Sequence, residues 1–312
     1  MSNVLCDMMG IKYPVLLGGM LFVGRARLVS AVSEAGGLGI LGAGAMGPEM
    51  LQREIQQIRK LTNLPFGINI PLKSPMAEDL VQVVLQASVR VISTSAGSPS
   101  RFTSLLKERG IIVLHVVPTV AHALQAQDAG VDAVVAEGSE SGGYINLDEV
   151  TTMALVPQVV DAVSIPVIAA GGIADARGLV AALALGAVGI QMGTRFLASQ
   201  ESDIPDDYKR AILLAQDTDT VVVREKKAAH RDLKRELIEG VSGSEMGSLL
   251  TADEIFSLLE KGTLKQLPKW VVSSAGQSAG LIHEIMAVEE MIHRLIDGAR
   301  KVIASLPERL PC

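Results

Sequence analysis

Aromatic residues, cysteines and excess positive charge are all scarce in this 312-residue chain. Aromatic residues make up 3% of it, and its two cysteines, Cys6 and Cys312, lie near opposite ends, so we expect neither a disulfide framework nor a metal site. The net charge of −6 offers no basic surface for nucleic acid. No apolar run is long enough to cross a membrane, and Asp7 and Lys12 interrupt any signal-like run, so a soluble cytoplasmic protein is expected.

Small and branched apolar residues are abundant instead. Hydrophobic residues make up 48% of the chain, a composition typical of parallel strands and the helices that pack on them. Short apolar runs alternate with helical patterns, which is the βαβα signature of a parallel sheet. The chain is long enough for one barrel of about 250 residues plus an additional element.

Eight strands are predicted before residue 193, each separated from the next by room for one helix. Eight strands close a (β/α)8 TIM barrel, whereas a doubly wound sheet usually has fewer and begins with a glycine fingerprint. The segment 36–39 (GGLG) precedes a strand instead of joining a strand to a helix, so it does not match that fingerprint. The predicted strands are Pro14–Leu17, Leu38–Leu41, Phe66–Ile70, Val89–Ser93, Ile111–Val116, Ala133–Ala136, Val167–Ala169 and Val188–Met192.

Three segments are expected along the chain. Residues 1–202 form the α/β barrel, and residues 203–270, which hold most of the charge clusters, form a small helical lid domain inserted after strand 8. Residues 271–312 contain apolar residues at helical spacing from about Gln277 to Leu306 and are expected to pack back on the barrel.

The carboxyl ends of barrel strands carry function, and here they are rich in glycine and small polar residues. Strands seven and eight run into Gly171 and Gly172 and into Gly193 and Thr194, where backbone N–H groups can approach an anion closely. Carboxylate pairs, a catalytic triad and metal ligands are not evident at these ends. The pattern therefore favours a phosphate-bearing cofactor over hydrolytic chemistry.

At this point the sequence resembles the FMN-dependent nitronate monooxygenases (2-nitropropane dioxygenases) and the related FMN-dependent enoyl-ACP reductases. The resemblance covers nearly the whole chain and implies a TIM barrel that holds FMN across its strand ends, beneath a helical lid. It rests on an ordered set of motifs: 18–20 (GGM), 35–39 (AGGLG), 65–69 (PFGIN), 136–138 (AEG), 142–143 (GG), 169–175 (AAGGIAD), 193–196 (GTRF) and 275–277 (AGQ).

The resemblance also implies which residues bind FMN. The phosphate is expected at Gly171, Gly172, Gly193 and Thr194, where the strand-end pattern had already predicted an anion. The remaining cofactor-binding residues implied by the resemblance are Gly18, Gly19, Met20, Asn69, Glu137, Gly143, Ala170 and Gln191. For Glu137 the alternative is a structural carboxylate that fixes a loop.

Tyr144 departs from the family pattern, because the glycine pair before it is normally followed by a histidine, the proposed acid–base residue. A tyrosine of ordinary pKa, about 10, is a proton donor at neutral pH. Tyr144 therefore fits protonation of a carbon after hydride addition better than proton abstraction from a nitroalkane. It hinders the oxidation of a nitronate less, because a nitronate is already deprotonated. The alternative is that it only packs over the cofactor.

Three other polar residues lie at a strand end or in the loop after the fourth strand. His115, at the end of the fifth strand, is the nearest replacement base, although its apolar neighbours also fit a core histidine. Ser95 and Ser98 could hydrogen-bond a substrate carbonyl or simply form their loop.

Three functions remain open from the sequence. The favoured one is NADH- or NADPH-dependent reduction of an activated C=C bond, such as an enoyl thioester. The second is a nitronate monooxygenase that needs O2 and no nicotinamide, and the third is a flavoprotein that has lost catalysis. A small-molecule substrate is expected, possibly on acyl carrier protein or CoA, and the family implies a homodimer without nucleic-acid or membrane partners.

Overall fold

The computed structural model describes residues 3–21, 23–224, 229–242 and 273–309. Within these residues, eight parallel strands form one sheet, and each lies within two residues of its predicted bounds. The strands are β1 (Val15–Leu17), β2 (Gly39–Gly42), β3 (Phe66–Pro71), β4 (Val91–Ser95), β5 (Ile112–Val117), β6 (Ala133–Glu137), β8 (Val167–Ala170) and β9 (Gly189–Met192).

The sheet closes into the predicted TIM barrel. Its strand order is β1-β9-β8-β6-β5-β4-β3-β2. Strands β2 to β9 are neighbours in chain order, apart from β7, which belongs to another sheet. The first strand, β1, pairs with the last, β9. A parallel bridge between Leu16 and Leu38 joins the two edges, with the Leu17 N–H donating to the Leu38 carbonyl at 2.9 Å. Closure leaves no free sheet edge in the barrel.

Alternation along the strands separates two apolar cores. The interior core includes Leu16, Leu114 and Ile168, and helix α1 (Val4–Met9) contributes Leu5 and Met9 to it. The Asn3 side chain caps α1 and donates to the Val188 carbonyl, just before β9, at 2.8 Å. Helix α1 therefore fills the amino-terminal end of the barrel, which leaves the carboxyl end for function.

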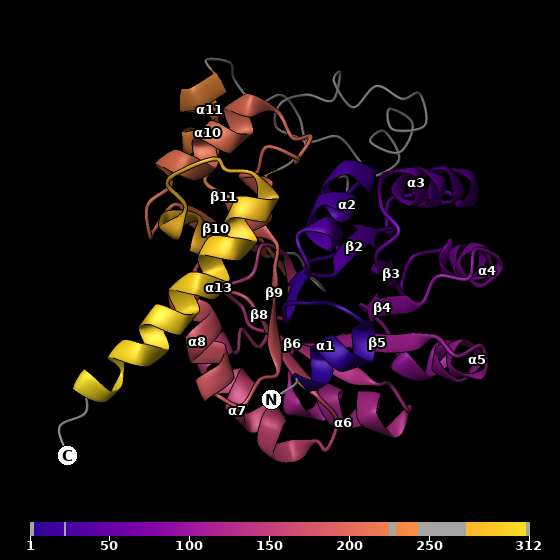
Figure 1. The fold of residues 1–312 in the computed structure, drawn as a ribbon. Helices are drawn as coiled ribbons and strands as arrows, with labels where there is room; N and C mark the ends of the chain where they lie inside the picture. Colours follow the sequence, from indigo (N-terminus) through magenta and orange to yellow (C-terminus); the bar gives the residue numbers. More distant parts are fainter. Residues whose placement is uncertain (1–2, 22, 225–228, 243–272, 310–312) are drawn as a thin grey trace.

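The outer core lies between the strands and the surrounding helices (Figure 1). Each helix presents one apolar face to the sheet, as β-α alternation requires. The surrounding elements are α2 (Ala26–Glu34), α3 (Pro48–Leu61), α4 (Ala77–Gln86), η1 (Pro99–Arg101), α5 (Thr103–Glu108), α6 (Val120–Asp128), α7 (Thr152–Ala162) and α8 (Ala176–Ala184).

The segment after β9 differs from the all-helical prediction, because its described part contains a β-hairpin. It comprises α9 (Thr194–Leu197), α10 (Asp206–Leu214), β10 (Thr220–Arg224), β11 (Ala229–Leu233) and α11 (Arg235–Ser242). Strand β7 (Gly143–Ile145), from the loop after β6, pairs with β11 to complete a three-stranded sheet. Residues 243–270 of the predicted lid lie outside the described residues.

The C-terminal segment contains η3 (Gln277–Leu281), the 18-residue helix α13 (Val288–Ser305) and η4 (Pro307–Arg309). Helix α13 crosses the outside of the barrel and packs on α8 and α2 (Figure 1). The contact with α8 is close, since a Cβ on Gly298 would lie 2.7 Å from the Cβ of Ala176. No described helix is both long and apolar enough to cross a bilayer. The division into three domains remains a prediction.

Candidate active site

Three neighbouring strands bring polar side chains to one side of the barrel mouth. Glu137, at the end of β6, is the register partner of Ala170 in β8, and Ala170 pairs in turn with Gln191 in β9. Val135 belongs to the interior core, so Glu137, two residues on, also points inward. Gln191 does the same, because both of its chain neighbours belong to the outer core.

A second polar group lies across the mouth, on β3 and β4. The Asn69 side-chain amide donates to Ser93 Oγ at 3.2 Å, and Ser95 Oγ lies 3.5 Å from Asn69 Oδ1. Asn69 and Ser93 are buried. The sequence predicted Asn69 and suggested Ser95, but it did not single out Ser93. Ser93 could have been found because it lies two residues before Ser95, on the same face of one strand.

The loop after β1 lies between these two groups. A Cβ on Gly19 would lie 2.4 Å from the Asn69 Cβ, so only glycine allows this loop to pass so close. The Gly18 N–H donates to the last carbonyl of β9 at 2.8 Å. Met20 faces Gly193, where a Cβ would lie 3.5 Å from the Met20 sulfur. The first loop therefore joins the opposite sides of the mouth.

The glycine loops after β8 and β9 present unpaired backbone donors. Gly171 and Gly172 have φ values of +98° and +71°, which favour glycine. Among the described residues, no acceptor pairs with the amide N–H of Gly171, Gly172 or Gly193, and all three are only partly buried. Successive N–H groups in such turns form anion-binding concavities.

Glu140 joins the loop after β6 to the start of α7 and packs against the loop after β8. Its carboxylate accepts from the Thr152 N–H at 2.8 Å and from the Thr152 hydroxyl at 2.9 Å, at the start of α7. A Cβ on Gly172 would lie 3.4 Å from the Glu140 Cβ. The sequence did not single out Glu140 or Thr152, since their contact becomes visible only when the loops are placed side by side.

The segment around Gly276 connects the β6 and β9 loops. The Gly276 N–H donates to Thr194 Oγ1 at 2.9 Å, and the Gln277 N–H donates to the Glu140 carbonyl at 2.9 Å. A Cβ on Gly142 would lie 2.6 Å from the Gly276 nitrogen. Thr194 accepts here, and within the described chain its hydroxyl proton has no acceptor, so it remains available to a bound anion.

Glu137 is the titratable group most perturbed at the mouth. Burial raises the pKa of its carboxyl to about 7, and the neighbouring Ser141 hydroxyl opposes part of that rise. The Ser141 Oγ is itself buried, and it has no other hydrogen-bond partner among the described residues. A carboxyl that is half protonated near neutral pH can either donate or accept a hydrogen bond.

Tyr144 lies on β7, which follows the loop after β6. Gly143, which precedes it, has a φ of +76°, and Tyr144 is 71% exposed. Its register partner on β11 is His230, with the two ring centroids 6.3 Å apart. The sequence placed His230 in a helical segment. The structure instead places it beside the predicted acid–base residue.

His115 does not face the mouth, so its prediction as a replacement base is wrong in position. It shares its side of β5 with Val113 and Val117, which belong to the outer core. Its Nδ1 lies 2.7 Å from Thr94 Oγ1. Burial lowers the pKa of His115 to about 4, and the charge of His122 contributes further. The alternative of a hydrogen-bonded core histidine describes it correctly.

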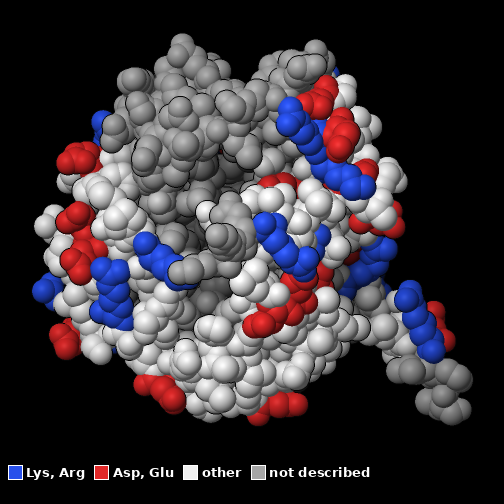
Figure 2. Space-filling model, turned by 180° about the vertical axis from the view of Figure 1, so that it is seen from behind, with Lys and Arg blue, Asp and Glu red and all other residues white. Residues whose placement is uncertain are grey.

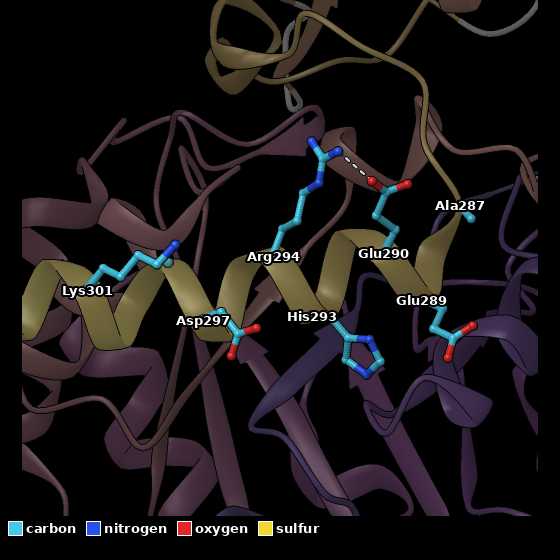
Figure 3. Close-up of a pocket in the computed structure, with 8 residues that line it drawn as sticks. Ala287, Glu289, Glu290, His293, Arg294, Asp297 and Lys301 are labelled. Atoms are coloured by element: carbon cyan, nitrogen blue, oxygen red, sulfur yellow. Dashed lines mark hydrogen bonds and ion pairs between the residues drawn. The ribbon is translucent and has the colours of Figure 1, made fainter.

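Other polar surfaces lie apart from this site. Ser98 is exposed and shares a hydrogen bond with Ser100, and it does not join the Asn69 group. A pocket on α13 is lined by charged side chains, among which Arg294 pairs with Glu290 (Figure 3). On the face seen in Figure 2, Lys and Arg are interspersed with Asp and Glu.

Comparisons with known proteins agree with this geometry. Residues 2–80 and 76–298 match the family model described as nitronate monooxygenase. The chain is 42% identical, over 77% of its length and 68% of the relative's, to the Mycobacterium tuberculosis (3aS,4S,5R,7aS)-5-hydroxy-7a-methyl-1-oxo-octahydro-1H-indene-4-carboxyl-CoA dehydrogenase. It is 33% identical to a probable nitronate monooxygenase of Staphylococcus saprophyticus, covering 97% and 99% of the two chains.

A solved structure matches the fold over its full length. FabK from Thermotoga maritima superposes with a TM-score of 0.89 at 42% sequence identity, covering 99% of this chain and 100% of the other. The similarity therefore extends over the barrel and the segments that follow β9.

Proposed function

Because the chain belongs to the nitronate monooxygenase family, we propose that it is an FMN-dependent oxidoreductase that uses NADH or NADPH to reduce an activated C=C bond. The observation that carries this proposal is the set of unpaired amide N–H groups on Gly171, Gly172 and Gly193. They lie beside the Thr194 hydroxyl at the open end of the barrel. Such donors fit a phosphate group, and the glycines leave room for it.

The polar residues of the mouth would hold the rest of the cofactor. Asn69, Glu137 and Gln191 point inward from opposite sides, where they can hydrogen-bond the flavin ring and the ribityl chain. Glu137 can serve as donor or acceptor, because burial raises the pKa of its carboxyl to about 7. Bound FMN would supply the hydride chemistry. Tyr144, exposed beside the mouth, would donate the proton that the substrate carbon then requires.

The comparisons support a thioester as the substrate class. The Mycobacterium tuberculosis relative is named as a carboxyl-CoA dehydrogenase, and this name describes a CoA derivative as its substrate. The structural match to FabK also supports this class, because the sequence resembles the FMN-dependent enoyl-ACP reductases. We therefore propose an enoyl group carried on CoA or acyl carrier protein. A cytoplasmic homodimer is part of the same proposal.

A nitronate monooxygenase is the second candidate. The Staphylococcus saprophyticus relative, which spans nearly the whole chain, is named a probable nitronate monooxygenase. A nitronate arrives already deprotonated, so Tyr144 would be no obstacle to that reaction. A flavoprotein without catalytic activity is the third candidate.

Anaerobic mixing of the FMN-loaded protein with NADH or NADPH separates the three candidates. Rapid bleaching of the flavin absorbance, followed by its recovery on adding crotonyl-CoA, is the result expected of the reductase. Absence of bleaching, together with O2 uptake on adding a nitronate, would reject the reductase in favour of the monooxygenase. No spectral change with either substrate would favour the third candidate.

A further inference from the structure

The sheet beside the barrel mouth contains a histidine–aspartate pair. His230 and Asp232 alternate along β11 and therefore lie on one face, where His230 Nε2 is 3.0 Å from Asp232 Oδ2. Asp232 is buried, and its other oxygen accepts from the Ser274 hydroxyl at 2.9 Å. A carboxylate fixed in this way holds an imidazole in one orientation and one tautomer.

The His230 imidazole is only partly enclosed by the protein. His230 keeps about a quarter of its side chain exposed, at 27%, and within the described residues its Nδ1 has no hydrogen-bond partner. The ring packs edge-on to Tyr144, with an interplanar angle of 63°. The two residues are direct cross-strand partners, so the sheet itself fixes this contact.

Two contacts connect the strand of this pair to the loop after β6. The side chain of Arg231, between the two residues, donates from Nε to the carbonyl of Ser139 at 3.0 Å, and Ser139 follows Glu137 by two residues. Gly142, two residues before Tyr144, packs against Gly276, whose N–H is bonded to Thr194. His230 therefore lies beside β7, the strand that follows the loop after β6.

We infer that His230, oriented by Asp232, supplies protons to Tyr144, so that it acts as a positioning and proton-relay residue. This inference rests on the proposed reductase function. The substrate gains a hydride at one carbon of its C=C bond and the phenolic proton of Tyr144 at the other. The phenolate then takes a proton from the His230 imidazolium through an intervening water molecule, and the imidazole takes one from solvent. The two electrons come from NADH or NADPH.

The chemical reason for the pair is the cost of a phenolate. A tyrosine that has given up its proton near neutral pH is a strong base whose charge is poorly stabilised without a nearby cation. A protonated imidazole beside it both stabilises this charge and restores the proton. Asp232 keeps the imidazole aligned and balances its positive charge.

A double-mutant cycle tests the relay in stopped-flow experiments. We expect His230→Gln to slow recovery of the flavin absorbance by enoyl thioester about 10²-fold, the low end for a lost acid–base group, and to leave bleaching by nicotinamide unchanged. In a Tyr144→Phe background, His230→Gln should add little, because both changes interrupt one path. Equal slowing in both backgrounds would overturn the relay. The matched control is His122→Gln, on the exposed side of α6.

Chemical rescue and histidine NMR keep the inference testable if a variant is unstable. Free imidazole should restore turnover to His230→Gly but not to His230→Gly combined with Tyr144→Phe. Nitrogen-15 histidine spectra should show the neutral His230 ring protonated at Nε2, and Asp232→Asn should disturb that tautomer. An Nδ1-protonated ring in the wild type would contradict the orientation.

The outcome distinguishes this inference from the proposed function. If the wild type bleaches and recovers while His230→Gln behaves identically, the relay is wrong and the reductase stands. If the wild type never bleaches, the reductase is rejected, and the relay with it, whatever tautomer the spectra show.

Discussion

The barrel mouth and the sheet of β7, β11 and β10 lie side by side but are built differently. The mouth is formed by the ends of consecutive strands, with Glu137, Ala170 and Gln191 aligned by register. The sheet unites Tyr144 with His230, from segments 86 residues apart, by antiparallel pairing. In the proposed function, the mouth holds the cofactor and the neighbouring sheet supplies the groups that move protons. Under this account, the two tasks can be damaged separately.

Replacing Tyr144 with Phe should give the largest effect on catalysis. Loss of the phenolic proton should slow recovery of the flavin absorbance by thioester about 10²–10⁴-fold, the range for a lost general acid. Bleaching by nicotinamide should remain unchanged, since that step uses the mouth alone. Stopped-flow absorbance measures both steps on one sample. Tyr13→Phe, outside the site, is the control, and equal slowing of both steps would contradict the separation.

Replacing Gly171 with Ala should damage the mouth instead. A Cβ there would lie 2.8 Å from the Gly138 carbonyl oxygen, and the φ of +98° is strained for alanine. We expect FMN to bind about 10–100-fold more weakly, from about 1–3 kcal/mol of strain. Fluorescence titration of FMN measures this affinity.

The control for this change is Gly110→Ala. Gly110 also has a positive φ, +67°, but nothing lies within 4 Å of its added Cβ. The Gly110→Ala variant has similar backbone strain but no clash with a neighbouring loop, so its affinity for FMN should be retained. If both variants lost affinity equally, general destabilisation would be the cause.

The Glu137 carboxyl makes stability depend on pH. Its pKa in the folded protein is about 7, above the value of the unfolded chain, so folding disfavours its ionisation. Stability from this group is complete below about pH 4.5 and is lost as the pH rises to about 7. Glu137→Gln cannot ionise, so its melting temperature should exceed that of the FMN-free wild type increasingly across this window. A constant difference would contradict the raised pKa, and the exposed Glu108→Gln should show none.

His115 gives the smallest expected effect and the opposite pH dependence. Burial lowers its pKa to about 4, so its stabilising contribution is present above about pH 6.5 and falls as the pH drops towards 4. His115→Gln should cost about 1 kcal/mol at neutral pH through the lost Thr94 hydrogen bond. Turnover should remain within a few-fold of wild type, with the exposed His283→Gln as the control. A large loss of turnover would return His115 to the active site.

The barrel could be predicted from the sequence because its signals are local. Each strand is a short apolar run, and the glycines and polar residues that follow it mark the carboxyl end. Glu137 and Gln191 were therefore placed on the same rim without knowledge of their register. The glycine pair at 171–172 also indicated a backbone with positive φ, which only residues without a Cβ adopt easily.

Two features of the site could not be predicted in this way. Both faces of β5 are covered by apolar residues, so the pattern around His115 does not tell which face the imidazole occupies. The hairpin of β10 and β11 lies among charged residues that favour a helical interpretation. The β-branched residues 220–223 could have indicated a strand there. The pairing of β11 with β7 is a long-range contact that no local pattern contains.

A crystal structure of the protein with FMN would show directly whether the barrel mouth is the cofactor site. We expect the phosphate between the loops of Gly171 and Gly172 and of Gly193 and Thr194, accepting from their N–H groups. We also expect the flavin beside Asn69, Glu137 and Gln191. A phosphate bound elsewhere, for example among the charged side chains of α13, would contradict the assignment of the barrel mouth as the cofactor site.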